Sequence, residues 1–259
     1  MKNLMKPLVG GAFLALSGTA QASIITDQTF DSDPVLADSR TDGAWFVDRS
    51  KPAGFSSVDF MGDKRLALTI SSDHTETDLF RFTQGRQFLT PGARMISIDW
   101  YLDPAFQNTT GRVGGLWGVG FGGDPSGVLS YPIIEFFEDQ FHVWDSVQGD
   151  DDGSGFRPAG LPDGVAFGEF VNMEIQLDPT ADLFRFFLND TLLGTEEAGG
   201  TTEIGSVILQ AVNTADGIDR TLYFDNFVAR SSIPVPATGL MLLIGVAGAA
   251  ALGRRARQA

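Results

Sequence analysis

The sequence predicts an all-β protein: a two-sheet antiparallel jelly-roll sandwich at residues 23–230, with an apolar segment at each end. Three observations lead to this fold class. Several short segments alternate apolar and polar residues at period two, which is typical of strands with one buried face. The chain has 31 glycines in 259 residues, and no segment of the body shows the periodicity of an amphipathic helix. A hydrophobic fraction of 43% is enough for a large core.

The strands are clearest at 96–102 and 171–177, where apolar and polar residues alternate strictly. After a short link, 184–188 continues the pattern. Asn189-Asp190 then fits a tight hairpin turn, because both residues tolerate left-handed backbone. Ten or more strands are expected, which favours two packed sheets. Further strands are predicted at 65–71, 116–121, 133–137, 141–144, 207–212 and 222–229.

The second half of the body is similar to the concanavalin A-like lectin and glucanase superfamily, which includes laminin-G-type modules. The similarity rests on the run VNMEI at 171–175 and on FRFFLNDTL at 184–192, which together read as two strands and a hairpin. The closing run YFDNF at 223–227 resembles the final strand of many secreted sandwich modules. The resemblance implies a concanavalin A-like jelly roll, and it implies the fold rather than an activity.

The amino terminus has the pattern of a secretory signal peptide at residues 1–22. Lysines at 2 and 6 precede an apolar run at 8–16, and Ala20-Gln21-Ala22 matches the small-residue cleavage site. The run is too short for a transmembrane anchor. We therefore expect a signal helix that is removed after Ala22.

The carboxyl terminus, 231–259, predicts a short transmembrane helix. Pro234-Val235-Pro236 precedes an apolar stretch at 237–253, and Arg254, Arg255 and Arg257 follow it. This order resembles the PEP-CTERM sorting tails, in the variant headed Val/Ile-Pro-x-Pro-Ala. The resemblance implies processing by an exosortase of a Gram-negative bacterium, and placement at the cell surface or in an extracellular matrix. Before processing, the span would hold the protein in the inner membrane, with the arginines in the cytoplasm.

The composition excludes several classes of function. A net charge of −15, which becomes −20 once both ends are removed, argues against binding to nucleic acid. With no cysteine, the chain can form neither a disulfide framework nor a thiol-based site. The glycine-rich run at 114–123 is not followed by a helix, so we interpret it as a strand with bulges rather than a nucleotide loop.

One motif suggests a calcium loop. Asp150, Asp152 and Ser154 stand at alternate positions before Gly155, as at the start of an EF-hand loop. The position of the bidentate glutamate holds Leu161, so a true EF-hand is rejected. Two interpretations remain open: an isolated calcium loop with Asp163 as a further ligand, and a solvated acidic turn.

Carboxylate spacing argues against glycoside hydrolysis, which needs two carboxyl groups about 5–9.5 Å apart. On a strand, Glu135 and Glu138 would face opposite sides, and Glu135 and Asp139 would share a face roughly 13 Å apart. Asp99 and Asp103 have the same spacing problem. No catalytic residue is therefore predicted.

Aromatic side chains could stack on sugar rings, and Tyr101 and Trp144 are the chosen carbohydrate-binding candidates, with Trp117 and Trp45 considered beside them. The favoured interpretation is an exported, non-enzymatic surface or matrix protein sorted by an exosortase. The alternative is a calcium-assisted, lectin-like carbohydrate-binding module with polysaccharide as partner. An atypical glycoside hydrolase is the third hypothesis.

Overall fold

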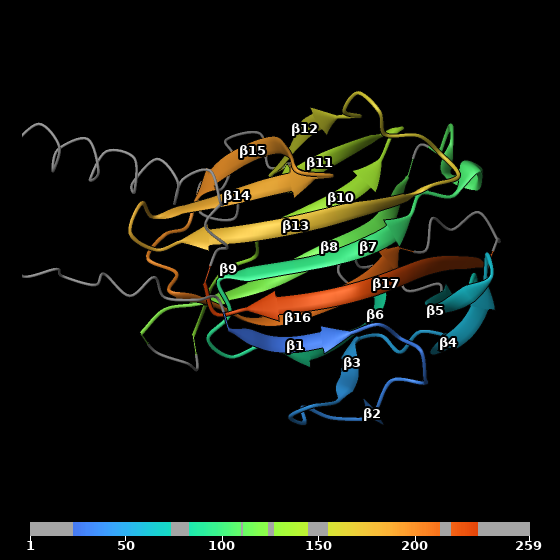
Figure 1. Ribbon diagram of the computed structural model, residues 1–259, viewed down its shortest axis with the longest axis horizontal. Coiled ribbons are helices and arrows are strands. Elements are labelled where there is room, and N and C mark those ends of the chain that lie inside the picture. The colour runs from blue at the N-terminus through green and yellow to red at the C-terminus, as the bar shows by residue number, and fades with distance from the viewer. Residues whose placement is uncertain are drawn as a thin grey trace, which may run out of the picture.

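The protein is a sandwich of two sheets, as the computed structural model shows (Figure 1), and all strand pairs in the described ranges are antiparallel except β2 with β3. The structure describes residues 23–73, 83–109, 111–123, 127–144, 155–212 and 219–232. The only helical element in these ranges is a 3-10 turn, η1 (Pro104–Phe106), whose first turn is capped by the Asp103 carboxylate. The all-β, two-sheet prediction is confirmed.

Sheet A has eight strands, in the order β15-β14-β13-β7-β17-β5-β4, with β1 paired to β17. Figure 1 shows the long strands β13, β7 and β17 side by side. The strands are β1 (Ile24–Gln28), β4 (Gly54–Phe60), β5 (Asp63–Ile70), β7 (Met95–Tyr101), β13 (Phe170–Asp178), β14 (Leu183–Leu188), β15 (Thr191–Glu197) and β17 (Arg220–Arg230).

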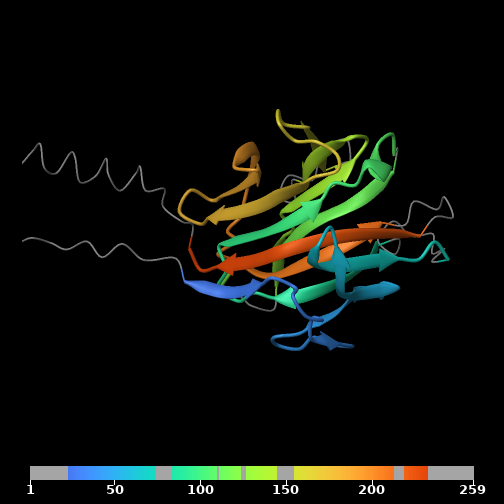
Figure 2. The same ribbon diagram turned by 45° about the vertical axis from the view of Figure 1, so that its right-hand side comes forward.

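Sheet B has nine strands, in the order β12-β11-β10-β8-β16-β6-β3-β2, with β9 paired to β8. Its two edges, β12 and β2, lie at opposite ends of the sheet, and Figure 2 shows the two regions well apart. The strands are β2 (Leu36–Ala37), β3 (Trp45–Arg49), β6 (Thr83–Leu89), β8 (Arg112–Phe121), β9 (Val128–Ser130), β10 (Ile133–Phe137), β11 (Gln140–Trp144), β12 (Phe156–Gly160) and β16 (Glu203–Val212).

The main core lies between the sheets. Strand β13 shows how the sequence builds it, because every second residue from Val171 to Leu177 is buried and the intervening residues are partly exposed. Trp100 of β7 is fully buried and packs edge-on against Phe136 and Phe141 of sheet B, with ring centroids 6.0 Å apart in both pairs. These aromatic contacts join the two sheets.

The predicted hairpin between β14 and β15 is confirmed. Asn189 and Asp190 have φ values of 45° and 62°, and the flanking residues Leu188 and Thr191 are paired. Two residues with positive φ make the turn type whose twist suits a two-residue hairpin.

Sheet B also buries its outer face. Trp117, Val119, Ile133 and Ile208 form a second apolar cluster there, with Phe121, and Trp144 and Phe156 pack against it. Strands β8 and β16 are consequently buried on both faces, which explains why their sequences are nearly continuous apolar and glycine runs rather than alternating ones.

Within the described ranges, no helix is long and apolar enough to cross a membrane. The expected signal helix at 1–22 and the expected transmembrane helix at 237–253 lie outside those ranges.

Candidate functional site

A row of polar side chains crosses the outer face of sheet B. The strand register places Glu135 opposite His142 on one side and opposite Gly115 on the other. Gly115 is in turn opposite Gln210. The row continues through Gly85 of β6 to Asp48 of β3. We call this set the polar row: His142, Glu135, Gly115, Gln210, Gly85 and Asp48.

Gln210 stands between two positions that cannot carry side chains. A Cβ on Gly115 would lie 2.0 Å from the Ile134 carbonyl oxygen, and one on Gly85 would lie 2.4 Å from the Leu209 carbonyl oxygen. Both are close approaches of backbone to backbone, so only glycine fits. The Gln210 amide therefore has no side chain beside it in the row on either side.

Glu135 is fully buried and is held by Arg112. The Arg112 Nε donates to Glu135 Oε1 at 2.9 Å, and a terminal nitrogen donates to Oε2, which makes a two-point pair. Burial raises the pKa of the Glu135 carboxyl, while Arg112 and, more weakly, the Trp117 indole lower it. Because both carboxylate oxygens are occupied, Glu135 fixes Arg112 over the face rather than acting as an acid or base.

Two arginine side chains, Arg49 and Arg112, lie over the ring of Trp117. The guanidinium carbons of Arg49 and Arg112 lie 5.2 and 5.7 Å from the centroid of its ring. Arg112 also lies 4.8 Å from the centroid of Phe156, which packs edge-on against Trp144 at 4.8 Å. Cations within about 6 Å of an aromatic face are attracted to it. The outer face of sheet B therefore joins aromatic rings to two partly exposed guanidinium groups.

Several buried polar atoms of this face have no hydrogen-bond partner. Both amide atoms of the fully buried Gln210 are among them, as is the Nδ1 of His142, which is 2% exposed. An unpaired buried amide costs about 1–3 kcal/mol, and more than about 90% of buried polar groups in proteins are paired. Such a set on one face is typical of a binding site.

The titratable groups of the row all shift toward their neutral forms. Burial raises the pKa of Asp48, against the lowering effect of Arg49, and burial raises that of Glu135. Burial also lowers the pKa of His142, whose ring stacks on Phe137 with centroids 3.5 Å apart. His142 is therefore a neutral imidazole near pH 7.

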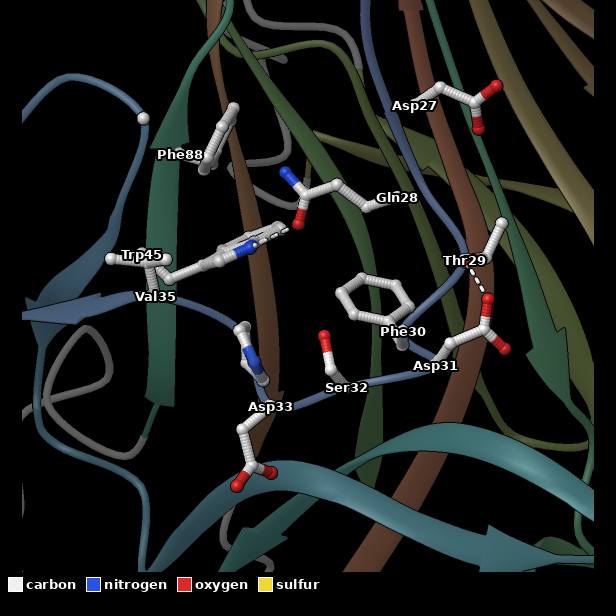
Figure 3. Close-up of a pocket in the computed structure, with 12 residues that line it drawn as sticks. Asp27, Gln28, Thr29, Phe30, Asp31, Ser32, Asp33, Val35, Trp45 and Phe88 are labelled. Atoms are coloured by element: carbon white, nitrogen blue, oxygen red, sulfur yellow. Dashed lines mark hydrogen bonds between the residues drawn. The ribbon is translucent and has the colours of Figure 1, made fainter.

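A cavity of about 410 Å³ lies elsewhere, beneath β1 and beside β3 (Figure 3). Figure 3 shows the rings of Phe30, Trp45 and Phe88 together, with the Asp31 and Asp33 carboxylates pointing away from them. The polar groups are paired within the chain: Trp45 Nε1 donates to Gln28 Oε1 at 2.9 Å, Thr29 Oγ1 to Asp31 at 2.5 Å, and the backbone N–H of Ser57 to Asp33 at 2.8 Å. These bonds hold the segment 29–35 against the sandwich.

The two predicted carbohydrate-binding residues lie on opposite faces of the molecule. Trp144 is half-buried on the outer face of sheet B, beside the polar row. Tyr101 is half-buried on the outer face of sheet A, among Phe60, Phe170 and Tyr223. The structure does not bring them together. Trp45, the other candidate, is 1% exposed in the core, whereas Trp117 lies in the candidate site.

Glu138 and Asp139 were expected on the same strand as Glu135, but they lie beyond its end. Strand β10 ends at Phe137, and Glu138 and Asp139 have φ values of 52° and 60° in the turn that follows, so Asp139 does not share the strand face of Glu135. The polar row contains two carboxylates, Glu135 and Asp48, four strands apart. At about 4.8 Å per strand this is roughly 19 Å, too far for the paired carboxylates of a glycosidase.

Other predicted site residues lie outside the described residues. These are the proposed calcium ligands Asp150, Asp152 and Ser154, the cleavage residues Ala20 and Ala22, and the tail residues Pro234, Val235, Pro236, Arg254 and Arg255. In the described part of the chain, no group of three or more histidine, aspartate or glutamate side chains is placed to hold a metal ion.

Gln210 and Arg112 were not among the site residues predicted from the sequence. Gln210 is a lone amide in the apolar run 207–212, and a polar residue at a position predicted to be buried is a usable signal. Arg112 gives no such signal, because it is 23 residues from Glu135 and its role depends on the pairing of β8 with β10.

No protein-family model and no curated protein matches the chain. Solved structures share its fold. The endo-1,3-β-glucanase (laminarinase) catalytic domain of Thermotoga petrophila is 13% identical with a TM-score of 0.55, over 83% of this chain and 100% of that one. The endo-β-1,4-glucuronan lyase of Trichoderma reesei is 14% identical with a TM-score of 0.52, over 82% and 96%. An endo-β-galactosidase of Clostridium perfringens is 13% identical with a TM-score of 0.55, over 82% and 62%.

These comparisons correct the functional prediction. These three structures are carbohydrate-active enzymes, two hydrolases of glycan chains and a lyase, which contradicts the interpretation as a non-enzymatic surface or matrix protein. The error came from treating the absence of a carboxylate pair in the sequence as evidence for passive cargo. At these identities the likeness establishes the fold, and the function has to be argued from the site.

Proposed function

We propose that this protein is a concanavalin A-like jelly-roll domain that binds a polysaccharide chain on the outer face of sheet B. The chain would lie over the polar row and contact Trp117 and Trp144. Aromatic rings offer apolar surface to the carbon–hydrogen faces of sugars, and fixed polar groups pair with the hydroxyls.

The observation that carries the proposal is the Gln210 amide. It is fully buried, its oxygen and nitrogen are both unpartnered, and the adjacent row positions are glycines. Gln210 is inaccessible to solvent, so a sugar reaches its amide only when the side chains that cover it move aside. A hydroxyl both donates and accepts hydrogen bonds, so it then suits an amide that offers one acceptor and two donors. The carbohydrate-directed activities of the laminarinase, lyase and galactosidase that share the fold add support.

Native gel electrophoresis in gels containing soluble β-1,3-glucan, galactan or β-1,4-glucuronan tests the proposal. The wild-type protein is expected to be retarded by at least one of them, and Gln210→Met is expected to lose most of that retardation. Gln84→Met is the control, because Gln84 is equally buried but is paired to the Ser71 backbone. Equal retardation of the wild type and Gln210→Met in every gel would refute the site.

A second candidate function is cleavage of a uronate-containing chain by β-elimination, which a neutral His142 opposite Glu135, the partner of Arg112, favours. Arg112 would neutralise the uronate carboxylate. The His142 Nδ1 would take the proton from the carbon that bears this carboxylate. The electron pair of that C–H bond forms a carbon–carbon double bond as the bond to the leaving oxygen on the adjacent carbon breaks, and the departing oxygen takes a proton from water to become the hydroxyl of the new chain end. Ultraviolet absorbance of the unsaturated product, lost in His142→Gln, would show this reaction. Binding without any such product would leave the first proposal alone.

We further propose that the protein meets its polysaccharide outside the cell, after signal cleavage and exosortase processing. The support is the sequence of the two ends, 1–22 and 231–259. Mass spectrometry of the protein from its native host should show both ends removed, and an intact tail on surface-exposed protein would contradict the processing.

A further inference from the structure

Four aromatic rings gather on the outer face of sheet A, the face away from the polar row. Phe60 stacks on Tyr223 with centroids 3.7 Å apart and an interplanar angle of 10°. Tyr101 meets Phe60 edge-on at 4.9 Å and Phe170 at 5.5 Å. The four residues come from β4, β17, β7 and β13, and each is partly exposed. We call them the aromatic platform.

The core does not require this platform. The inner face of sheet A already holds Trp100, Phe184, Phe186 and Phe224, all essentially inaccessible to solvent. Aromatic surface left on the solvent side gives up burial worth about 25 cal/mol per Å², and clustered exposed rings usually mark a binding surface.

The platform includes two tyrosines, Tyr101 and Tyr223, whose rings pack against Phe60. Both side chains are partly exposed. A ring that is fixed by packing and carries a hydroxyl at its edge is suited to a ligand that is apolar on its faces and polar at its edges.

A second polar row lies next to the platform on the same face, two residues further along the strands. Asp99 accepts from Asn172 Nδ2 at 2.7 Å and from Asn226 Nδ2 at 2.8 Å, which fixes both amides. Asp225 stands opposite Asp99 and forms an ion pair with Arg65 at 2.8 Å. The same face therefore presents rings and positioned hydrogen-bonding groups side by side.

We propose that the aromatic platform and this second row form another polysaccharide-binding surface, and that its ligand is an uncharged chain. Charge decides the ligand: Asp63, Asp99 and Asp225 lie beside the rings with Arg65 between them, and the whole chain is strongly acidic. An anionic polymer would be repelled. With the site on sheet B, the protein then has glycan-binding surfaces on opposite faces and bridges two chains. The bridging, though not the platform itself, rests on the proposed function.

The test is binding to neutral β-glucans by affinity electrophoresis, with Tyr101→Ala and Phe170→Ala as variants. Each is expected to weaken binding by about tenfold or more, as truncation of a central aromatic anchor does. The matched control is Phe187→Ala, a half-buried phenylalanine on the same face of sheet A at β14, away from the platform. It should bind like the wild type. Thermal melts identify variants that bind poorly because they are unfolded, and for those Tyr101→Phe, which keeps the ring, replaces the alanine variant.

These variants test the two proposed binding surfaces independently of each other. If Tyr101→Ala and Phe170→Ala fold and bind neutral glucan like the wild type, the platform is not a binding surface and the inference is overturned, whatever Gln210→Met does. If they lose binding while Gln210→Met does not, the inference holds and the proposed site on sheet B fails. Bridging of two glycan chains is measured as the turbidity of glucan-coated beads. The sheet A variants Tyr101→Ala and Phe170→Ala and the sheet B variant Gln210→Met should each abolish bead aggregation. Aggregation that persists in Tyr101→Ala would contradict the bridging.

Discussion

Replacing Gln210 by methionine should make the protein more stable and a poorer binder. The amide is fully buried and its two polar atoms are unpartnered, so the folded state carries a desolvation cost of about 1–3 kcal/mol. Methionine has a similar length, no strongly polar atom and enough flexibility to fill the same space. The substitution should recover most of that cost. In a domain of this size, each kcal/mol raises the melting temperature by about 2–4 °C.

Urea unfolding of the wild type, Gln210→Met and Gln84→Met measures the effect. Gln84 is buried to the same degree but makes two hydrogen bonds of 2.9 Å with the Ser71 backbone, so its replacement should cost about 2 kcal/mol. The free energy of unfolding should therefore change in opposite directions for the two substitutions. A destabilisation of Gln210→Met as large as that of Gln84→Met would refute the reasoning, because it would mean that the Gln210 amide is already satisfied.

Three further predictions follow from the same contacts. Arg112→Met leaves the buried Glu135 charge unpaired and should lower the free energy of unfolding by about 3–5 kcal/mol at neutral pH. Because burial raises the folded pKa of Glu135, this loss should shrink as the pH falls toward 4 in urea titrations. An equal loss at pH 5 and pH 8 would contradict the pairing. His142 has a folded pKa below its unfolded value of about 6.5, so the folded state binds fewer protons than the unfolded state. The wild type should therefore lose stability as the pH falls below 6.5, by at most about 1.4 kcal/mol per pH unit. His142→Gln should remove that slope, and parallel pH profiles for the two proteins would contradict a lowered pKa at His142. Asp190→Gly, at a turn position with φ of 62°, should stabilise the β14–β15 hairpin by about 0.5–1 kcal/mol in thermal melts, and a lower melting temperature would count against the turn.

The strands that show most clearly in the sequence are those with one solvent-exposed face. In β13, the polar residues Asn172, Glu174 and Gln176 mark the outer side, and the period-two pattern is visible directly. The missed strands lack that pattern for identifiable reasons. Strand β6 begins Thr-Gln-Gly-Arg, because Gln84 and Arg86 are buried polar residues bonded to backbone carbonyls and Gly85 is required by close backbone approach.

The candidate site was predicted only in fragments. Trp144 and Trp117 were recognised as aromatics that could contact sugar, and the structure places both on the outer face of sheet B. What joins them to Gln210 is the strand order β11-β10-β8-β16, in which β10 and β16 are far apart in the sequence. Local periodicity says nothing about which strands are neighbours, so the partner of Glu135 could not be predicted.

The indole N–H signals of the four tryptophans offer the most direct test of polysaccharide binding on sheet B. Trp117 and Trp144 lie on its outer face, whereas Trp100 is fully buried between the sheets and Trp45 is bonded to Gln28 beside the cavity of Figure 3. In a ¹H–¹⁵N NMR titration with the polysaccharide that retards the protein, assigned by single tryptophan-to-phenylalanine variants, the Trp117 and Trp144 signals should shift and the other two should stay in place. Saturating ligand that leaves both of these signals unmoved, or that moves Trp45 alone, would contradict the account.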